Sequence, residues 1–204
     1  MQRPVVEFWF EFASTYSYLA VMRIEQAADE AGVDVAWRPF LLGPVFLALG
    51  WNDSPFNIYP PKGRYMWRDL ARLADKYRLP FRMPSRFPRN GLLAARVALV
   101  GETETWVAAF ARAAMKANFA EDREIGEPGV IRQILQAQGL PAEDIMARAQ
   151  SEDIKAALRR QTERAAELGL FGAPSFRVGD ELFWGNDRLE DALAWARRPP
   201  QPAA

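Results

Sequence analysis

Two serines that follow an aromatic segment are the first candidates for chemistry in this chain. Ser14 and Ser17 lie three positions apart in the run FEFASTYSY, residues 10–18. The chain contains no cysteine and no histidine. This excludes disulfides, thiolate or histidine metal sites, cysteine nucleophiles and Ser-His-Asp catalysis from its own residues, and we predict no metal site. Chemistry must therefore use hydroxyls, carboxylates, amines and backbone groups, or a reactive group that a cofactor supplies.

The Ser14 hydroxyl is placed to stabilise an anion, because a helix is expected to begin close to it. The unpaired N–H groups and the positive dipole end of a helix N-terminus favour negative charge. A hydroxyl that donates a hydrogen bond to a thiolate also lowers the pKa of that thiol, since it stabilises the charged form. The alternative interpretation is that Ser14 only caps the helix.

A second candidate is the proline in the run FGAPSF, residues 171–176, which directly precedes a predicted strand. A cis bond between Ala173 and Pro174 would turn the preceding backbone N–H and C=O groups outward, where an extended ligand could pair with them.

The third candidate is the run FWGNDRL, residues 183–189. Asn186 or Asp187 is expected to be the N-cap of a helix there, and Asp187 could alternatively bind an ammonium group.

The elements that must position these groups begin with a βαβ unit. Residues 5–12 are aromatic and β-branched without a breaker, which predicts a buried strand. A helix is predicted over 17–31, with Gly32 as its C′ residue, and a second strand over 35–40, parallel to the first. Prolines and glycines between 43 and 63 predict an irregular loop that could line a site.

The rest of the chain is predicted to be helical until residue 169. We expect helices at 65–79, 90–100, 102–117, 128–138, 141–150 and 151–169. Two short strands follow at 175–178 and 181–184, and then a helix at 187–197. The order βαβ, helical block, αββα predicts an α/β fold, a thioredoxin-like domain with a large all-helical insertion. We assign 1–42 and 170–198, with the closing helix 151–169, to that domain, 43–150 to the insertion and 199–204 to a frayed tail.

Charge and hydropathy argue against nucleic acid and membranes as partners of this chain. The 204 residues are 50% hydrophobic and carry 26 basic and 26 acidic side chains. This balance gives no global field for nucleic acid or a membrane surface. The apolar run near the N-terminus is too short for a signal peptide or membrane span. We therefore expect a cytoplasmic enzyme or binding domain without a nucleic-acid or membrane partner.

Four ordered motifs carry a resemblance that covers nearly the whole chain. They are FEFASTYSYLA, PPKGRYMWRDL, FPRNGLLAARVAL and FGAPSFRVGDELFWGNDRLE. Together they resemble the 2-hydroxychromene-2-carboxylate isomerases and the kappa-class glutathione transferases, a branch of the thioredoxin superfamily. Thr15 departs from the proline that is usual there, and Ala173 is smaller than the usual valine or leucine.

The resemblance implies glutathione as the cofactor, so that the tripeptide supplies the sulfur that this chain lacks. Ser14 is then the catalytic residue that stabilises the glutathione thiolate. The positions implied to hold the tripeptide are Lys62, Asn57, Ala173, Pro174, Asn186 and Asp187. Within this set, Asp187 would face the γ-glutamyl ammonium and Lys62 the glycine carboxylate, while Asn57 is a weaker match. The alternative for Lys62 is a solvated surface charge.

The activity that the resemblance implies is isomerisation of 2-hydroxychromene-2-carboxylate to trans-o-hydroxybenzylidenepyruvate by reversible thiolate addition. The alternatives are a kappa-class-like transferase or peroxidase, and a non-catalytic peptide-binding relative. An aromatic substrate needs an apolar cleft. The aromatic side chains expected near it are Phe40, Phe46, Trp51, Tyr59, Tyr65 and Trp67. The resemblance also implies a homodimer.

Overall fold

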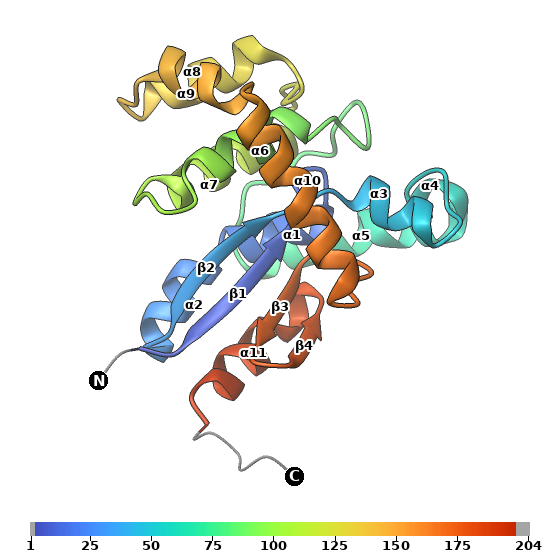
Figure 1. The fold of residues 1–204 in the computed structure, drawn as a ribbon. Coiled ribbons are helices and arrows are strands. Elements are labelled where there is room, and N and C mark those ends of the chain that lie inside the picture. The colour runs from blue at the N-terminus through green and yellow to red at the C-terminus, as the bar shows by residue number, and fades with distance from the viewer. Residues whose placement is uncertain (1–2, 199–204) are drawn as a thin grey trace.

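A four-stranded sheet lies at the centre of the computed structural model, which describes residues 3–198. The strands are β1 (Val5–Phe10), β2 (Asp34–Pro39), β3 (Ser175–Val178) and β4 (Glu181–Trp184), in the order β2-β1-β3-β4. The β1–β2 pair is parallel, as predicted, while β3 pairs antiparallel with both β1 and β4 (Figure 1). Strand β1 therefore brings the N-terminal and C-terminal segments of the chain together.

The side chains of β1 alternate between two hydrophobic layers, as expected for a strand covered on both faces. Phe8 points into the larger core, where its ring stacks on Phe176 of β3 with centroids 5.3 Å apart. These two residues are direct partners in the β1–β3 register. Trp9 points the opposite way and contacts Phe40 edge to face, with ring centroids 6.0 Å apart. The aromatic content of this strand thus fixes helices on both faces.

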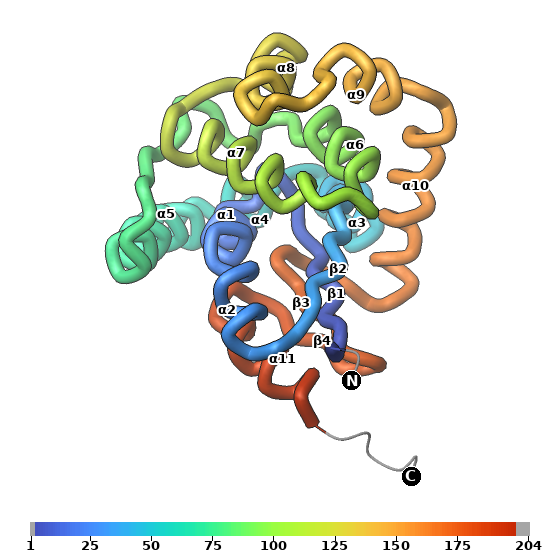
Figure 2. Tube along the Cα trace, turned by 90° about the vertical axis from the view of Figure 1, so that its left-hand side faces the viewer, coloured from blue at the N-terminus to red at the C-terminus, as the bar shows by residue number. Residues whose placement is uncertain are grey.

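Helices cover both faces of the sheet. On one side lie α1 (Thr15–Val21), α2 (Ile24–Ala31) and α11 (Leu189–Ala196), whose apolar side chains join the core around Phe8. On the other side α10 (Glu152–Glu167) packs over Trp9 through Ala165. Figure 2 shows the strands between these two helical layers. The sheet and its helices form the predicted thioredoxin-like fold.

The single helix predicted over 17–31 is instead two helices, and this prediction was wrong. The chain breaks between α1 and α2 at Arg23, which also packs against the C-terminal part of the protein. Its guanidinium donates to Asn186 Oδ1 at 2.9 Å and lies 3.8 Å from the ring centroid of Tyr77. Gly32 ends α2 in the left-handed conformation with φ 68°, as predicted.

The prediction of an irregular loop over 43–63 was also wrong. This segment contains α3 (Leu42–Ala48), α4 (Pro55–Ile58) and the start of α5 (Pro60–Lys76). Its prolines lie in the first turns of these helices, where a backbone N–H has no intrahelical acceptor to lose. Proline at these positions starts a helix rather than preventing one.

The remaining helices follow the sequence prediction more closely. They are α6 (Leu92–Val100), α7 (Val107–Phe119), α8 (Pro128–Ala137) and α9 (Ala142–Ala149). They gather at the end of the sheet opposite α11 (Figures 1 and 2). Helix α7 begins later than predicted because 101–106 form turns, in which the Trp106 ring fills the space beside Gly101. Within residues 3–198, no helix is long and apolar enough to cross a bilayer.

Candidate functional site

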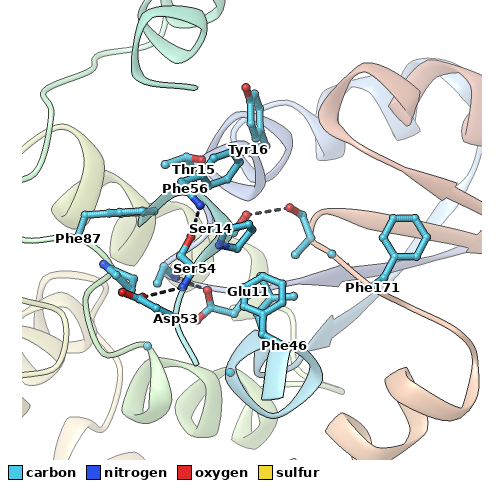
Figure 3. Close-up of a pocket in the computed structure, with 18 of the residues that line it drawn as sticks. Glu11, Ser14, Thr15, Tyr16, Phe46, Asp53, Ser54, Phe56, Phe87 and Phe171 are labelled. Atoms are coloured by element: carbon cyan, nitrogen blue, oxygen red, sulfur yellow. Dashed lines mark hydrogen bonds between the residues drawn. The ribbon is translucent and has the colours of Figure 1, made fainter. Parts of the chain in front are cut away.

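A cavity of about 1330 Å³ opens where the turn between β1 and α1 meets α3, α4 and the loop before β3 (Figure 3). Two kinds of side chain line it. One part of the wall is polar and carries Glu11, Ser14, Lys62, Asp69, Asn186 and Asp187. The other part is aromatic and carries Phe46, Trp51, Phe56, Phe87, Phe171 and Trp184. The cavity therefore offers charge and hydrogen bonds beside an apolar surface.

Ser14 lies at the rim of this cavity as the N-cap residue of α1. Its backbone is extended, with φ −78° and ψ 120°, and its Oγ accepts a hydrogen bond from Ser17 N at 3.2 Å. The same hydroxyl donates to Ala173 O at 2.9 Å, as Figure 3 shows. A hydroxyl has one donor and two acceptor sites, so capping does not exhaust it. Ser17 is fully buried and its Oγ accepts from Glu11 N instead of facing the cavity.

The Ala173-Pro174 bond is cis, as predicted. Ala173 lines the cavity, and its carbonyl accepts the Ser14 hydroxyl, which joins the loop before β3 to the start of α1. The carbonyl of Pro174 points elsewhere and accepts from Gly185 N at 2.9 Å. Pro174 therefore fixes the loop after β4, and only Ala173 of this pair reaches the cavity surface.

Asn186 and Asp187 lie in a short 3-10 helix, η1 (Asn186–Arg188), that leads into α11. Neither residue is a helix cap: Gly185 precedes η1 and Arg188 precedes α11, so the N-cap prediction was wrong. Asn186 is buried, and its Oδ1 accepts from Arg23 while its Nδ2 has no partner among the described residues. The Asp187 carboxylate is 70% exposed and lies 3.2 Å from Arg188. Within residues 3–198, Asn186 thus has one buried amide donor without a partner, and Asp187 has an accessible carboxylate.

The two loop residues predicted to bind a ligand have different positions. Lys62 lines the cavity, with its Nζ 5.9 Å from the ring centroid of Phe56, and makes no ion pair with any residue in 3–198. Asn57 does not line the cavity, because its amide donates to the Asp53 carboxylate at 3.1 and 3.2 Å. The structure therefore gathers most of the predicted set around one cavity, with Asn57 and Pro174 outside its wall.

Half of the predicted aromatic side chains line the cavity: Phe46, Trp51 and Tyr65. Phe40 is instead fully buried beneath α10, Trp67 packs edge to face on Phe87, and Tyr59 is half-exposed away from the wall. The aromatic lining residues that were not predicted are Tyr16, Phe56, Phe87, Phe171 and Trp184. They come from segments far apart in the chain, so no local spacing connects them.

Glu11 is a cavity residue to which sequence reasoning assigned no role. It is 8% exposed, and its Oε2 accepts a hydrogen bond from Ala13 N at 2.9 Å. Burial raises the pKa of Glu11 to about 8, although hydrogen bonds from the backbone of Ala13 and Ser14 act to lower it. The sequence did offer one sign of this role, because Glu11 interrupts a run of aromatic residues that was predicted to be buried. Acidic residues are rarely buried, so one inside such a run is informative.

Asp69 was missed in the same way, because its role depends on a tertiary contact. The Tyr16 hydroxyl donates to Asp69 Oδ2 at 2.9 Å across the interface of α1 and α5. Burial, and then the neighbouring Asp69 carboxylate, raise the pKa of Tyr16. Tyr16 therefore remains a neutral donor that holds Asp69 in the polar part of the wall.

Comparison with known proteins agrees with this architecture. The profile of the DSBA-like thioredoxin domain matches residues 5–194. The 2-hydroxychromene-2-carboxylate isomerase of Sphingobium xenophagum is 31% identical over 186 residues, which cover 91% of this chain and 94% of that protein. The chain belongs to the 2-hydroxychromene-2-carboxylate isomerase family.

Members of this family and its kappa-class relatives share the whole length of the chain. A solved structure of a 2-hydroxychromene-2-carboxylate isomerase superposes with a TM-score of 0.84 at 27% identity, covering 94% of this chain and 95% of that one. Glutathione S-transferase kappa 1 of Caenorhabditis elegans is 25% identical over 98% of this chain and 93% of its own length. The family assignment therefore applies to the helical segment between β2 and β3 as well as to the sheet.

Proposed function

We propose that this chain is a glutathione-dependent isomerase that converts 2-hydroxychromene-2-carboxylate to trans-o-hydroxybenzylidenepyruvate. The observation that carries the proposal is the convergence of Ser14, Ala173, Asn186 and Asp187 on one cavity with an aromatic wall. Because the chain has no cysteine, a thiol nucleophile for this site must come from outside. Membership of the isomerase family supports the choice of substrate.

The polar wall fits the charges of glutathione, which has one ammonium group, two carboxylates and a thiol. Asn186 Nδ2 is a buried donor without a partner in the described part of the chain, and leaving such a donor unsatisfied costs roughly 1–3 kcal/mol. A ligand carboxylate would remove that cost. Asp187 offers an accessible carboxylate for the ammonium group, and Lys62 an unpaired cation for the second carboxylate.

When bound, glutathione would supply a thiolate that adds reversibly to the conjugated double bond of the ring-opened substrate, so that rotation about this bond becomes free. The Ser14 hydroxyl is the donor that this chain offers to an anion at the rim of the cavity. To serve it, the hydroxyl must turn from Ala173 O, which requires only rotation about its C–O bond. The aromatic wall, with Phe46 and Phe171, excludes water and orients a planar substrate.

The second candidate is a kappa-class-like glutathione transferase. The likeness to the kappa-class enzyme over nearly the whole chain favours it, because the same polar wall would hold the tripeptide in both activities. The two differ in the second reactant, which is an electrophile that keeps the glutathione sulfur in the transferase reaction. Substrate turnover therefore separates the candidates, whereas glutathione binding does not.

Calorimetry with reduced glutathione tests the site, and ultraviolet absorbance with 2-hydroxychromene-2-carboxylate tests the activity. We expect a Kd between about 1 µM and 1 mM, and isomerisation that depends on glutathione. Asn57→Ala is the matched control, because Asn57 lies outside the cavity wall, and it should bind as the parent does. Absence of binding at millimolar glutathione contradicts both candidates. Binding without isomerisation, together with conjugation of electrophiles, favours the transferase.

A further inference from the structure

Glu11 is a carboxyl group held in the cavity wall one turn before Ser14. Its carbonyl accepts from Ser14 N at 3.0 Å and its backbone N–H donates to Ser17 Oγ at 3.4 Å, so the start of α1 fixes the backbone on both sides. The side chain points into the same cavity as Ser14, as Figure 3 shows. The fold therefore holds an acidic group beside the catalytic serine in one fixed position.

The two carboxyl oxygens of Glu11 have different surroundings. Oε2 accepts a hydrogen bond from Ala13 N at 2.9 Å. Oε1 faces Gly91, where a Cβ atom would lie only 2.8 Å from it, and it forms no hydrogen bond within residues 3–198. A protonated carboxyl group has a single O–H donor. Because Oε2 already faces a donor, the proton belongs on Oε1, which has no competing partner.

The groups around Glu11 keep it uncharged near neutral pH. Helix α3, which also lines the cavity, has no charged side chain, and Gly91, in the segment that leads into α6, lies close to Oε1. The charged residues of the cavity wall are Asp53, Lys62, Asp69, Arg89, Asp187 and Arg188. Of these, Arg89 directs its guanidinium away, to Asn118 and Asp122. Burial raises the pKa of Glu11 to about 8, so the acid form prevails at pH 7.

We propose that Glu11 is the general acid and base of the isomerisation, exchanging its Oε1 proton with the ketone oxygen of the substrate. On addition of the thiolate to the ring-opened substrate, a C–S bond forms, the C=C electron pair becomes the enol double bond, and the π pair of the ketone moves to its oxygen. That oxygen takes the Glu11 proton, so the O–H bond of Glu11 breaks as the enol O–H bond forms. When the double bond re-forms after rotation, the same proton returns to Oε1. Glu11 thus regains its proton in each turnover, and no group is oxidised or reduced. This role rests on the proposed isomerase function.

The role predicts a difference between two reactions of the same site. Isomerisation needs a proton donor and acceptor, because the oxygen charge forms and disappears in each turnover. Aromatic substitution of a chloronitrobenzene by glutathione expels chloride, which leaves as a stable anion without a proton. Loss of the Glu11 proton should therefore slow the first reaction and spare the second. A general loss of packing would slow both.

The test compares Glu11→Gln with Glu7→Gln. Glu7 is a matched control because it lies on the same strand, outside the cavity, and pairs with Arg38 and Arg177. Carbon-13 NMR of the free protein should show one glutamate carboxyl that titrates near pH 8 in the parent and in the control, and that is missing in Glu11→Gln. Isomerisation kcat should fall about 100- to 10,000-fold in Glu11→Gln. Its aromatic substitution rate and both rates of the control should change less than about threefold.

Each outcome decides the proposal. A parent in which no glutamate carboxyl titrates above pH 7 overturns it without any activity measurement. A Glu11→Gln variant with parental isomerisation kcat overturns the role of Glu11 and leaves the isomerase function standing. A parent that binds no glutathione or does not isomerise the substrate overturns the proposed function, and this role with it. If Glu11→Gln fails to fold, the parent decides, because its kcat must fall as the pH passes about 8.

Discussion

Replacing Glu11 by glutamine should change how the stability of the free protein depends on pH. Burial raises the pKa of Glu11 in the folded state from its ordinary 4.5 to about 8. Below pH 4.5 the carboxyl group is protonated in both states and contributes no pH dependence. Between these two values the unfolded chain releases the proton and the folded protein keeps it, so stability falls as the pH rises. Above about pH 8 Glu11 is ionised in both states, and stability falls no further on its account.

The size of this loss follows from the shift. Each pKa unit is worth 1.36 kcal/mol, so a shift from 4.5 to about 8 amounts to roughly 5 kcal/mol. This is large against the usual domain stability of about 5–15 kcal/mol. Few other side chains change charge near neutral pH, because the chain has no histidine or cysteine to titrate there. A pH-dependent difference between parent and variant can thus be assigned to one side chain.

Urea denaturation followed by tryptophan fluorescence, from pH 4.5 to 9, measures the effect. The free energy of unfolding of the parent should fall relative to Glu11→Gln by about 5 kcal/mol over this range, with the steepest change below pH 8. Glu7→Gln is the matched control, because Glu7 lies on the strand that leads to Glu11, outside the cavity, and the fall seen in the parent should persist in this variant. Parallel curves for the parent and Glu11→Gln would refute the reasoning, because Glu11 would then titrate alike in both states.

Three further changes probe the site. Ser14→Ala should raise the pH at which bound glutathione shows thiolate absorbance and lower turnover about 10- to 1000-fold, while unfolding free energy falls by only about 0.5–2 kcal/mol from the lost cap. Asp187→Asn should weaken glutathione binding in calorimetry by about 1–3 kcal/mol and leave the melting temperature nearly unchanged, because this carboxylate is exposed. Gly91→Ala should destabilise the fold by about 1–3 kcal/mol, because its Cβ would lie 2.8 Å from the buried Glu11 Oε1 and 3.1 Å from Phe12 Cβ, which the backbone holds in place. The control Gly129→Ala, with open space around it in α8, should stabilise the protein by about 0.5–1 kcal/mol in the same denaturation assay.

The sheet was predictable because its strands are locally distinct. Residues 5–10 and 175–178 have the apolar and β-branched content of buried strands, and the parallel pairing of the first two strands follows from the helical crossover between them. The segment 43–63 was mispredicted because a proline count ignores position within the helix. The break at Arg23 was not predictable, since it serves contacts to Asn186 and Tyr77 that only the folded chain creates.

In the candidate site too, residues placed by local sequence could be predicted, and those placed by tertiary contacts could not. Ser14, Ala173 and Asp187 could be predicted to lie near one another because each stands at the end of a predicted element, and all three line the cavity. Asn57 was placed in the site by motif alone, whereas its amide is taken up by the neighbouring Asp53. Glu11 was overlooked because burial, which gives it its chemistry, is a property of the packed cavity wall.

The polar and aromatic walls of the cavity come largely from different segments of the chain, so side chains proposed to bind the cofactor and those proposed to select the substrate can vary separately. The polar wall comes partly from segments next to β1, β3 and β4, which the Ser14 to Ala173 hydrogen bond joins, and partly from α5, which carries Lys62 and Asp69. Much of the aromatic wall comes from α3, α4 and the loop before α6, which lie outside the sheet. Substitutions at Phe46 or Phe87 can therefore change the second reactant without disturbing the groups proposed to hold the tripeptide.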